Sequence, residues 1–109
     1  MNLTINIKII CFYLLNLLLF LIVDKNEHRL IGCSLLYIFG LYLFKINWKL
    51  GLPFFAMAVG AAITEHIFIK YMKNTWSYKT PDIGEVPYWL IPLWGNAIII
   101  INEATKLFN

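Results

Sequence analysis

The chain has 109 residues, of which 61% are apolar and only 14% are charged, with a formal net charge of +3. Its mean hydropathy is +0.71. A soluble domain of this size would leave much of that apolar surface in water, because small chains bury proportionally little of their surface. The composition therefore excludes an ordinary cytosolic globular protein, a disordered chain and a disulfide-stapled secreted module. It predicts an integral membrane protein.

Four apolar runs, taken in chain order, predict four transmembrane helices. Three of them lack charged residues and the other contains a single acid; they cover residues 9–23, 30–44, 50–69 and 86–101. A straight span needs about 20 residues, so the short runs extend into their flanks. We expect one domain, 1–109, as an all-α, up-down-up-down four-helix transmembrane bundle with helices at about 3–23, 30–47, 50–72 and 86–103. The alternative is three spans and a half-inserted second segment.

The first apolar run also has the length of a signal sequence, and the basic residue Lys8 precedes it. No small-x-small cleavage site follows the run, so we interpret it as a retained helix. The orientation of the bundle in the membrane stays open, because the positive-inside rule gives nearly equal counts for the two ends. One end has Lys25, Arg29, Lys70, Lys73 and Lys79, and the other has Lys8, Lys45, Lys49 and Lys106.

The acidic residues gather at one end of the predicted bundle, whereas the basic residues do not. This end carries the first and third connections between helices and is called face A; face B carries the second connection and both termini. Five of the six acids and both histidines lie on or near face A: Asp24, Glu27, Glu65, Asp82, Glu85, His28 and His66. We expect any chemistry or recognition to take place at this end.

Glu65 is the main candidate for a functional residue, because it lies inside the third apolar run, near its edge. An acid within a membrane span is energetically unfavourable and suggests a function by default. Small residues predict that this side of the helix packs into the bundle: Ala58, Ala61 and Ala62, with Ala56, Gly60 and Thr64 in a neighbouring row. The alternative is that Glu65 reaches interfacial water or pairs with Lys70 or Lys73.

His66 and Asp82 complete the predicted catalytic set with Glu65. A carboxyl group in an apolar pocket has a raised pKa, which suits proton transfer. A metal site would need three or four convergent ligands, and no spacing here matches a known ligand motif. We therefore predict neither a metal site nor a cofactor.

The third connection and the fourth helix supply the candidate ligand-binding residues, which are Trp76, Tyr78, Trp94 and Asn96. Pro81 and Asp82 form a turn signal, Pro87 fits the first turn of a helix, and Pro92 should bend that helix one turn later. The aromatic residues are interpreted in two ways. They form an interfacial aromatic belt, or they form the mouth of a pocket for a lipid-like ligand with Asn96 as a buried polar contact.

Residues 76–95 have the pattern W-x-Y-x-x-P-D-x-G-x-V-P-x-W-L-x-P-L-W-G. This pattern, about a fifth of the chain, resembles the last loop and helix of small multi-pass membrane proteins to which no activity is assigned. The membrane glutamate Glu65, the W-x-Y loop and the G-x-x-P helix entry are also similar to carotenoid-modifying membrane enzymes. Those enzymes are larger and have more helices, so this chain carries part of their pattern. The second resemblance implies an isoprenoid substrate.

Two functions follow from these observations. The chain is a structural or accessory component of a membrane, or it is a lipid- or isoprenoid-modifying enzyme that uses Glu65 as general acid or base. The first is favoured, because four short helices leave little room for a substrate pocket. The expected partners are the lipid bilayer and an apolar or isoprenoid ligand, in a multi-pass location that is the cell membrane in a bacterium. No nucleic acid is expected, since the nine basic residues are spread over both faces. Homo- and hetero-oligomers both stay open.

Overall fold

The computed structural model describes residues 3–72 and 76–108. Its elements are α1 (Leu3–Ile22), α2 (Asn26–Leu43), α3 (Trp48–Tyr71), α4 (Leu90–Thr105) and the short 3₁₀ helix η1 (Lys106–Phe108). Within the described residues there is no strand, and the one β-type feature is an isolated bridge between Ile83 and Val86. The prediction of an all-α chain with four helices is confirmed.

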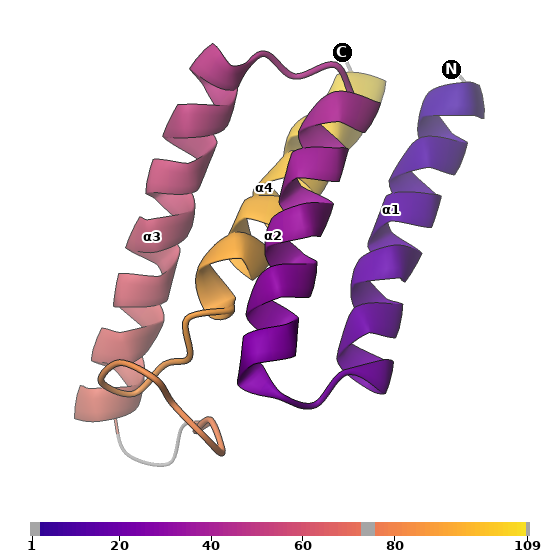
Figure 1. Ribbon diagram of the computed structural model, residues 1–109. Coiled ribbons are helices and arrows are strands. Elements are labelled where there is room, and N and C mark those ends of the chain that lie inside the picture. The colour runs from indigo at the N-terminus through magenta and orange to yellow at the C-terminus, as the bar shows by residue number, and fades with distance from the viewer. Residues whose placement is uncertain (1–2, 73–75, 109) are drawn as a thin grey trace.

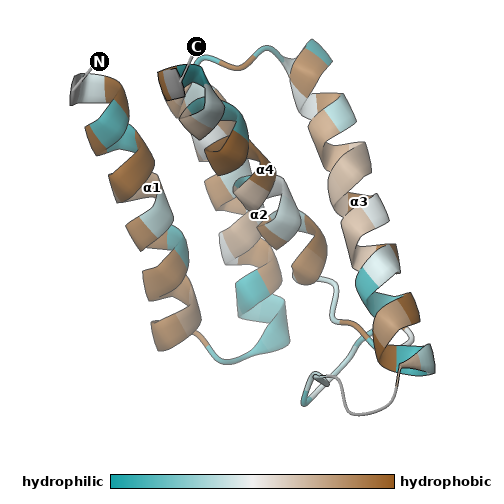
Figure 2. Cartoon of the chain, turned by 180° about the vertical axis from the view of Figure 1, so that it is seen from behind, coloured by the Kyte–Doolittle hydropathy of each residue, from teal (hydrophilic) through white to brown (hydrophobic). Residues whose placement is uncertain are grey.

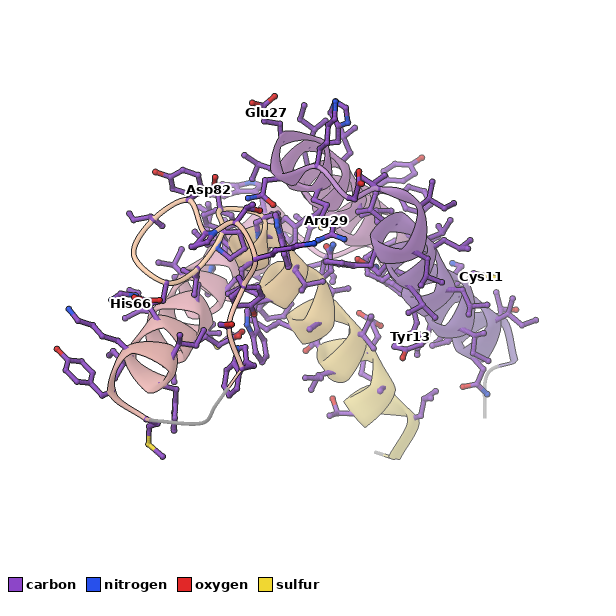
Figure 3. The ribbon with its side chains drawn as sticks, turned by 90° about the horizontal axis from the view of Figure 1, so that it is seen from below. Cys11, Tyr13, Glu27, Arg29, His66 and Asp82 are labelled. Carbon is purple, nitrogen blue, oxygen red and sulfur yellow. The ribbon has the colours of Figure 1, made fainter. Side chains whose placement is uncertain are left out.

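The central element of the molecule is α4. It packs against α1, α2 and α3, and α1 and α3 lie on opposite sides of it (Figures 1 and 3). Both chain ends lie at the same end of the molecule as the connection between α2 and α3 (Figure 1). The other two connections lie at the opposite end, which corresponds to face A. The helix α4 is therefore the one that all three other helices contact.

Two clusters of buried apolar side chains hold α4 in place. The first contains one residue from each of the four helices: Phe12, Tyr37, Phe54 and Ile99. The second joins α3 to the segment that leads into α4 and consists of Ala62, Val86, Trp89 and Leu90. Because these clusters contact the two halves of α4, they fix the central helix along most of its length.

The first turn of α2 lies where the sequence predicted a connection. The helix begins at Asn26 rather than at residue 30. Arg29 explains the difference: its Nε donates to the carbonyl oxygen of Val23 at 2.7 Å, and its Nη2 donates to that of Phe20 at 3.3 Å. These carbonyls belong to the C-terminal end of α1, where a basic side chain satisfies unpaired oxygens and the helix dipole. The link between α1 and α2 thereby shortens to residues 23–25.

The fourth helix begins later than predicted, and this changes the roles of two prolines. Because α4 begins at Leu90, Pro87 precedes the helix instead of opening it. Pro92 is the third residue of α4, at a position where a backbone N–H has no acceptor within the helix. The predicted first-turn position of Pro87 is therefore wrong, and Pro92 removes no hydrogen bond from within α4.

The two rows of small residues on α3 lie on different faces. Ala58 and Ala62 are buried against the rest of the molecule, as predicted. Ala56, Gly60 and Thr64 are exposed, so the prediction that this second row also packs inward is wrong. The reason is geometric: residues two apart in a helix point about 200° apart, so Ala56 and Ala58 face opposite directions.

A matched pair of glycine substitutions tests this packing. A Cβ at residue 95 would lie 2.8 Å from the ring of Tyr37, whereas nothing lies within 4 Å of a Cβ at residue 60. The Tyr37 ring is anchored, because its hydroxyl donates to the carbonyl oxygen of Gly51 at 2.6 Å. We expect Gly95→Ala to lower the free energy of unfolding by about 1–3 kcal/mol. Gly60→Ala should raise it by about 0.5–1 kcal/mol, because alanine favours a helix.

Thermal unfolding in a mild detergent, followed by circular dichroism, measures both changes. Equal melting temperatures for the two variants would contradict the position of α4 against α2.

Candidate functional site

Glu65 on α3 accepts three hydrogen bonds from aromatic side chains. Its Oε1 accepts from the hydroxyl of Tyr78 at 2.6 Å and from the indole Nε1 of Trp76 at 3.2 Å. Its Oε2 accepts from the indole Nε1 of Trp94 on α4. The structure thus brings together four of the seven predicted site residues: Glu65, Trp76, Tyr78 and Trp94.

The position of Glu65 follows from its spacing on α3. It lies three residues after Ala62 and seven after Ala58, so all three side chains share the face that packs toward α4. Trp94 lies in the second turn of α4, opposite this face, and the connection between α3 and α4 brings Trp76 and Tyr78 to the same point. The prediction that Glu65 points into the bundle agrees with these contacts.

The donors around the Glu65 carboxylate are neutral. Among the described residues the one ion pair is between Lys106 and Glu103, so Lys70 does not pair with Glu65. The predicted alternative partner Lys73 lies outside the described residues. An ionised carboxylate has about four acceptor sites on its two oxygens, and the three donors use three of them. The indole and phenol groups therefore supply most of the hydrogen bonds that the carboxylate needs.

Tyr78 is the titratable donor of this group. Burial raises the pKa of Tyr78 above its ordinary value of 10.0, and its hydrogen bond to the Glu65 carboxylate raises the pKa further. Burial leaves a phenolate poorly solvated, and the neighbouring carboxylate would place a second negative charge beside it. Tyr78 therefore remains a proton donor to Glu65 over the whole neutral range.

His66 follows Glu65 in sequence but takes part in a different contact. Its Nδ1 accepts a hydrogen bond from the backbone N–H of Glu85 at 3.1 Å. The ring lies against Gly84, whose φ is +56°, and a Cβ there would be 2.5 Å from the ring carbon Cε1. Glycine is required at this position for both reasons. His66 also lines an apolar cavity of about 420 Å³.

Asp82 lies in a third group of contacts, which attaches the connection to α2. Its Oδ2 accepts from the backbone N–H of Tyr88 at 3.0 Å and from Nδ2 of Asn26 at 3.3 Å. Asn26 Nδ2 also donates to the carbonyl oxygen of Thr80, and Asn26 Oδ1 accepts from Nε1 of Trp89 at 3.1 Å. The predicted catalytic set is thus divided, with Asp82 bonded to the backbone and to Asn26 rather than to Glu65.

Asn96 lies apart from Glu65, in the interior between α1, α2 and α4. It is 1% exposed, and its Nδ2 donates to Oδ1 of Asn16 at 2.7 Å and to the carbonyl oxygen of Cys33 at 3.2 Å. The structure agrees with the predicted burial of Asn96, and its predicted contact with a ligand stays a prediction. Its partner Asn16 was missed by the sequence analysis, although an asparagine within an apolar run was the available signal.

Arg29 was also missed, because the sequence placed it in a charged loop. Its guanidinium lies 5.0 Å from the ring centre of Phe20 and 5.3 Å from that of Trp89. Figure 3 shows Arg29 among the side chains at face A, between the connection and the helices. Besides capping α1, this side chain therefore contacts the segment that leads into α4.

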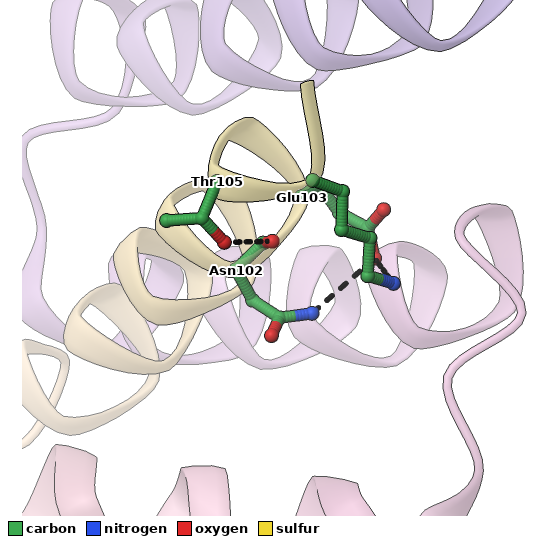
Figure 4. A network of polar contacts seen from close by, with 4 residues as sticks. Asn102, Glu103 and Thr105 are labelled. Atoms are coloured by element: carbon green, nitrogen blue, oxygen red, sulfur yellow. Dashed lines mark hydrogen bonds and ion pairs between the residues drawn. The ribbon is translucent and has the colours of Figure 1, made fainter. Parts of the chain in front are cut away.

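A separate polar group lies near the other end, on the last turn of α4 (Figure 4). Glu103 is 4% exposed, and its Oε1 forms an ion pair with Nζ of Lys106 at 3.0 Å. Nδ2 of Asn102 donates to the same oxygen at 3.5 Å, and the hydroxyl of Thr105 donates to the carbonyl oxygen of Asn102 at 2.8 Å. These contacts are local to the end of α4 and the start of η1, and they satisfy a buried acid.

No family model, curated protein or solved structure matches this chain.

Replacing one oxygen of Glu65 tests the three-donor arrangement. In Glu65→Gln, the remaining oxygen can accept from Tyr78 and Trp76, but the new NH₂ group then faces the indole N–H of Trp94. Two donors facing each other leave both unsatisfied, so we expect the variant to be less stable by about 1–3 kcal/mol. The loss should be smaller in a Trp94→Phe background, because phenylalanine has no N–H there.

The measurement is chemical unfolding of the wild type, the two single variants and the double variant. Strictly additive losses would show that Trp94 does not donate to Glu65.

The pKa of Tyr78 gives a second prediction. Because the folded-state pKa is above the unfolded value, the stabilisation by Tyr78 is complete below pH 10.0 and is lost as the pH rises through the folded-state pKa. The melting temperature of the wild type should exceed that of Tyr78→Phe at neutral pH, and the gap should narrow above pH 10.0. Tyr42→Phe, at an exposed position on α2, is the control. A gap between wild type and Tyr78→Phe that is independent of pH would refute this assignment.

Proposed function

We propose that the chain is a four-span integral membrane protein that serves as a structural or accessory component of its membrane, with an up-down-up-down path. The observation that carries this proposal is the exposure of its most apolar helices. Two helices, α1 over Thr4–Ile22 and α3, are long and apolar enough to cross a membrane. In the most apolar stretch of 18 residues in each helix, only 11% of the residues of α1 and 17% of those of α3 are buried. The core helix of a soluble protein is mostly buried. Lipid is the environment that suits such a surface.

The distribution of polar and apolar residues supports the same proposal. Apolar segments run along α1, α3 and α4, whereas the connections are mostly polar or intermediate in hydropathy (Figure 2). The buried polar side chains Asn16, Asn96 and Glu103 lie inside and are hydrogen-bonded to neighbours within the molecule. Polar side chains that bond between helices stabilise bundles in lipid, where water is absent.

The two remaining spans are α2 and α4, which are shorter. At about 1.5 Å per residue, a helix of 18 residues such as α2 is about 27 Å long, close to the thickness of a bilayer core. The helix α4 has 16 residues and is followed directly by η1, which adds to the span. Both chain ends lie at face B (Figure 1), as an even number of spans requires.

The structural role is supported by the way in which Glu65 is bonded. Its three hydrogen bonds join α3, the connection and α4, so the carboxylate holds these elements together. A partly buried acid whose two oxygens both accept from ring donors of other elements acts as a structural link.

The second candidate function is a lipid- or isoprenoid-modifying enzyme, and one observation favours it. Tyr78 donates to Glu65 and also lines an apolar cavity of about 300 Å³ between α1 and α4. A ligand in this cavity would contact the ring whose hydroxyl is bonded to the candidate acid or base. This is also the class of reaction that the resemblance of the W-x-Y loop implies.

Reporter fusions test the topology. Fusions after residues 46 and 109 should report one side of the membrane, and a fusion after residue 24 should report the other side. The reason is that face B and face A would lie on opposite sides of the bilayer. Reporters at residues 1 and 109 on opposite sides would exclude four spans.

Lipid extracts distinguish the two candidate functions. Membranes that contain the wild type, Glu65→Ala or the control Tyr42→Phe are compared by mass spectrometry. A structural role predicts the same lipid composition in all three, together with a lower melting temperature for Glu65→Ala. A lipid species that changes with the wild type and with Tyr42→Phe, but not with Glu65→Ala, would favour the enzyme instead.

A further inference from the structure

The cavity between α1 and α4 has a buried polar group in its wall. Its volume is about 300 Å³, and side chains of both helices line it, among them Leu17 and Ala97. Asn16 and Asn96 also line it and are hydrogen-bonded to each other. This volume is at the small end of the range for ligand cavities. In such cavities, a few polar groups in an otherwise apolar wall fix the orientation of the ligand.

The amide group of Asn96 has one unused hydrogen-bonding atom. Its Nδ2 donates to Oδ1 of Asn16 and to the carbonyl oxygen of Cys33, which uses both of its protons. Since both partners are acceptors, the orientation of the Asn96 amide is determined. Oδ1 of Asn96 is buried and has no partner, and it is the one such side-chain atom in the described part of the chain. A buried oxygen of this kind needs a donor.

A single water molecule would satisfy this oxygen but would leave most of the cavity unfilled, since water occupies about 30 Å³ in the liquid. In the asparagine pair, Nδ2 of Asn16 donates to the carbonyl oxygen of Phe12 at 2.9 Å and its Oδ1 accepts from Asn96. A donor group that is attached to an apolar chain also removes apolar surface from water, because its chain fills the rest of the cavity.

We propose that the cavity between α1 and α4 binds an aliphatic alcohol, whose hydroxyl donates to Oδ1 of Asn96 and whose chain lies against the apolar side chains of α1 and α4. Ethers, esters and ketones lack the donor, and a charged head group is disfavoured by the apolar wall. Oδ1 of Asn96 is covered by its neighbours, so the hydroxyl reaches it when lining side chains shift. Binding of an alcohol in this cavity requires neither the proposed four-span topology nor a reaction at Glu65, so it is tested independently of both.

The test compares 1-decanol with its methyl ether and with decane, using the full chain in lipid nanodiscs. Binding is followed by the NMR signals of the ¹⁵N-labelled Asn96 side-chain amide. We expect saturable binding of 1-decanol, about tenfold tighter than that of the ether, which corresponds to a difference of about 1.4 kcal/mol. Equal affinity for the three probes would overturn the proposal, because it would show a cavity that takes any apolar chain. Absence of saturable 1-decanol binding would also overturn it.

Two variants locate the bound alcohol. In Asn96→Leu the preference for 1-decanol over its ether should disappear. Because this variant also removes the partner of Asn16 and can fail to fold, Ala97→Leu provides a second test that fills the cavity and leaves the asparagine pair intact. Ala97→Leu should weaken 1-decanol binding at least tenfold, and the control Ala56→Leu, on the exposed face of α3, should not. Wild-type binding by Ala97→Leu would exclude this cavity as the site.

Discussion

Glu65 is the hydrogen-bond acceptor at which α3, α4 and the connection between them meet. Glu65 accepts hydrogen bonds from Trp76 and Tyr78 of this connection and from Trp94 of α4. The same connection also packs Val86 and Trp89 into a buried apolar cluster with Ala62 and Leu90. Because the three donors are rings, the same residues that satisfy the carboxylate also cover apolar surface next to it. The position of the segment that leads into α4 follows from this arrangement.

A second set of contacts fixes the same connection to α1 and α2. Asn26 bonds to Asp82 and to Trp89, and Arg29 joins the end of α1 to the Trp89 ring. Face A is therefore a network in which α1, α2 and α3 each have at least one polar or aromatic contact with the connection. Of the acids and histidines that the sequence placed at this end, Glu65, His66 and Asp82 take part in three separate local contacts rather than in one common site.

The sequence predicted those features that depend on spacing along one helix. The apolar runs gave four helices, and the position of Glu65 relative to Ala58 and Ala62 gave its inward direction. The predictions from sequence were wrong where a feature is decided by a contact between residues that are distant in sequence. The start of α2 depends on Arg29 reaching back to α1, and the division of Glu65, His66 and Asp82 depends on the path of the connection. The pairing of Asn16 with Asn96 spans 80 positions and leaves no local pattern.

The central position of α4 has a consequence for the order of assembly. This helix is synthesised after the other three, yet it is the one that packs against all of them. Until it emerges, the first three helices have only the contacts that they make with one another, such as Arg29 with the end of α1 and Tyr37 with Gly51. The buried face of α3 that carries Ala62 lacks its partners Trp89 and Leu90 until then. A ribosome that stops at residue 89 would release a chain without its central element.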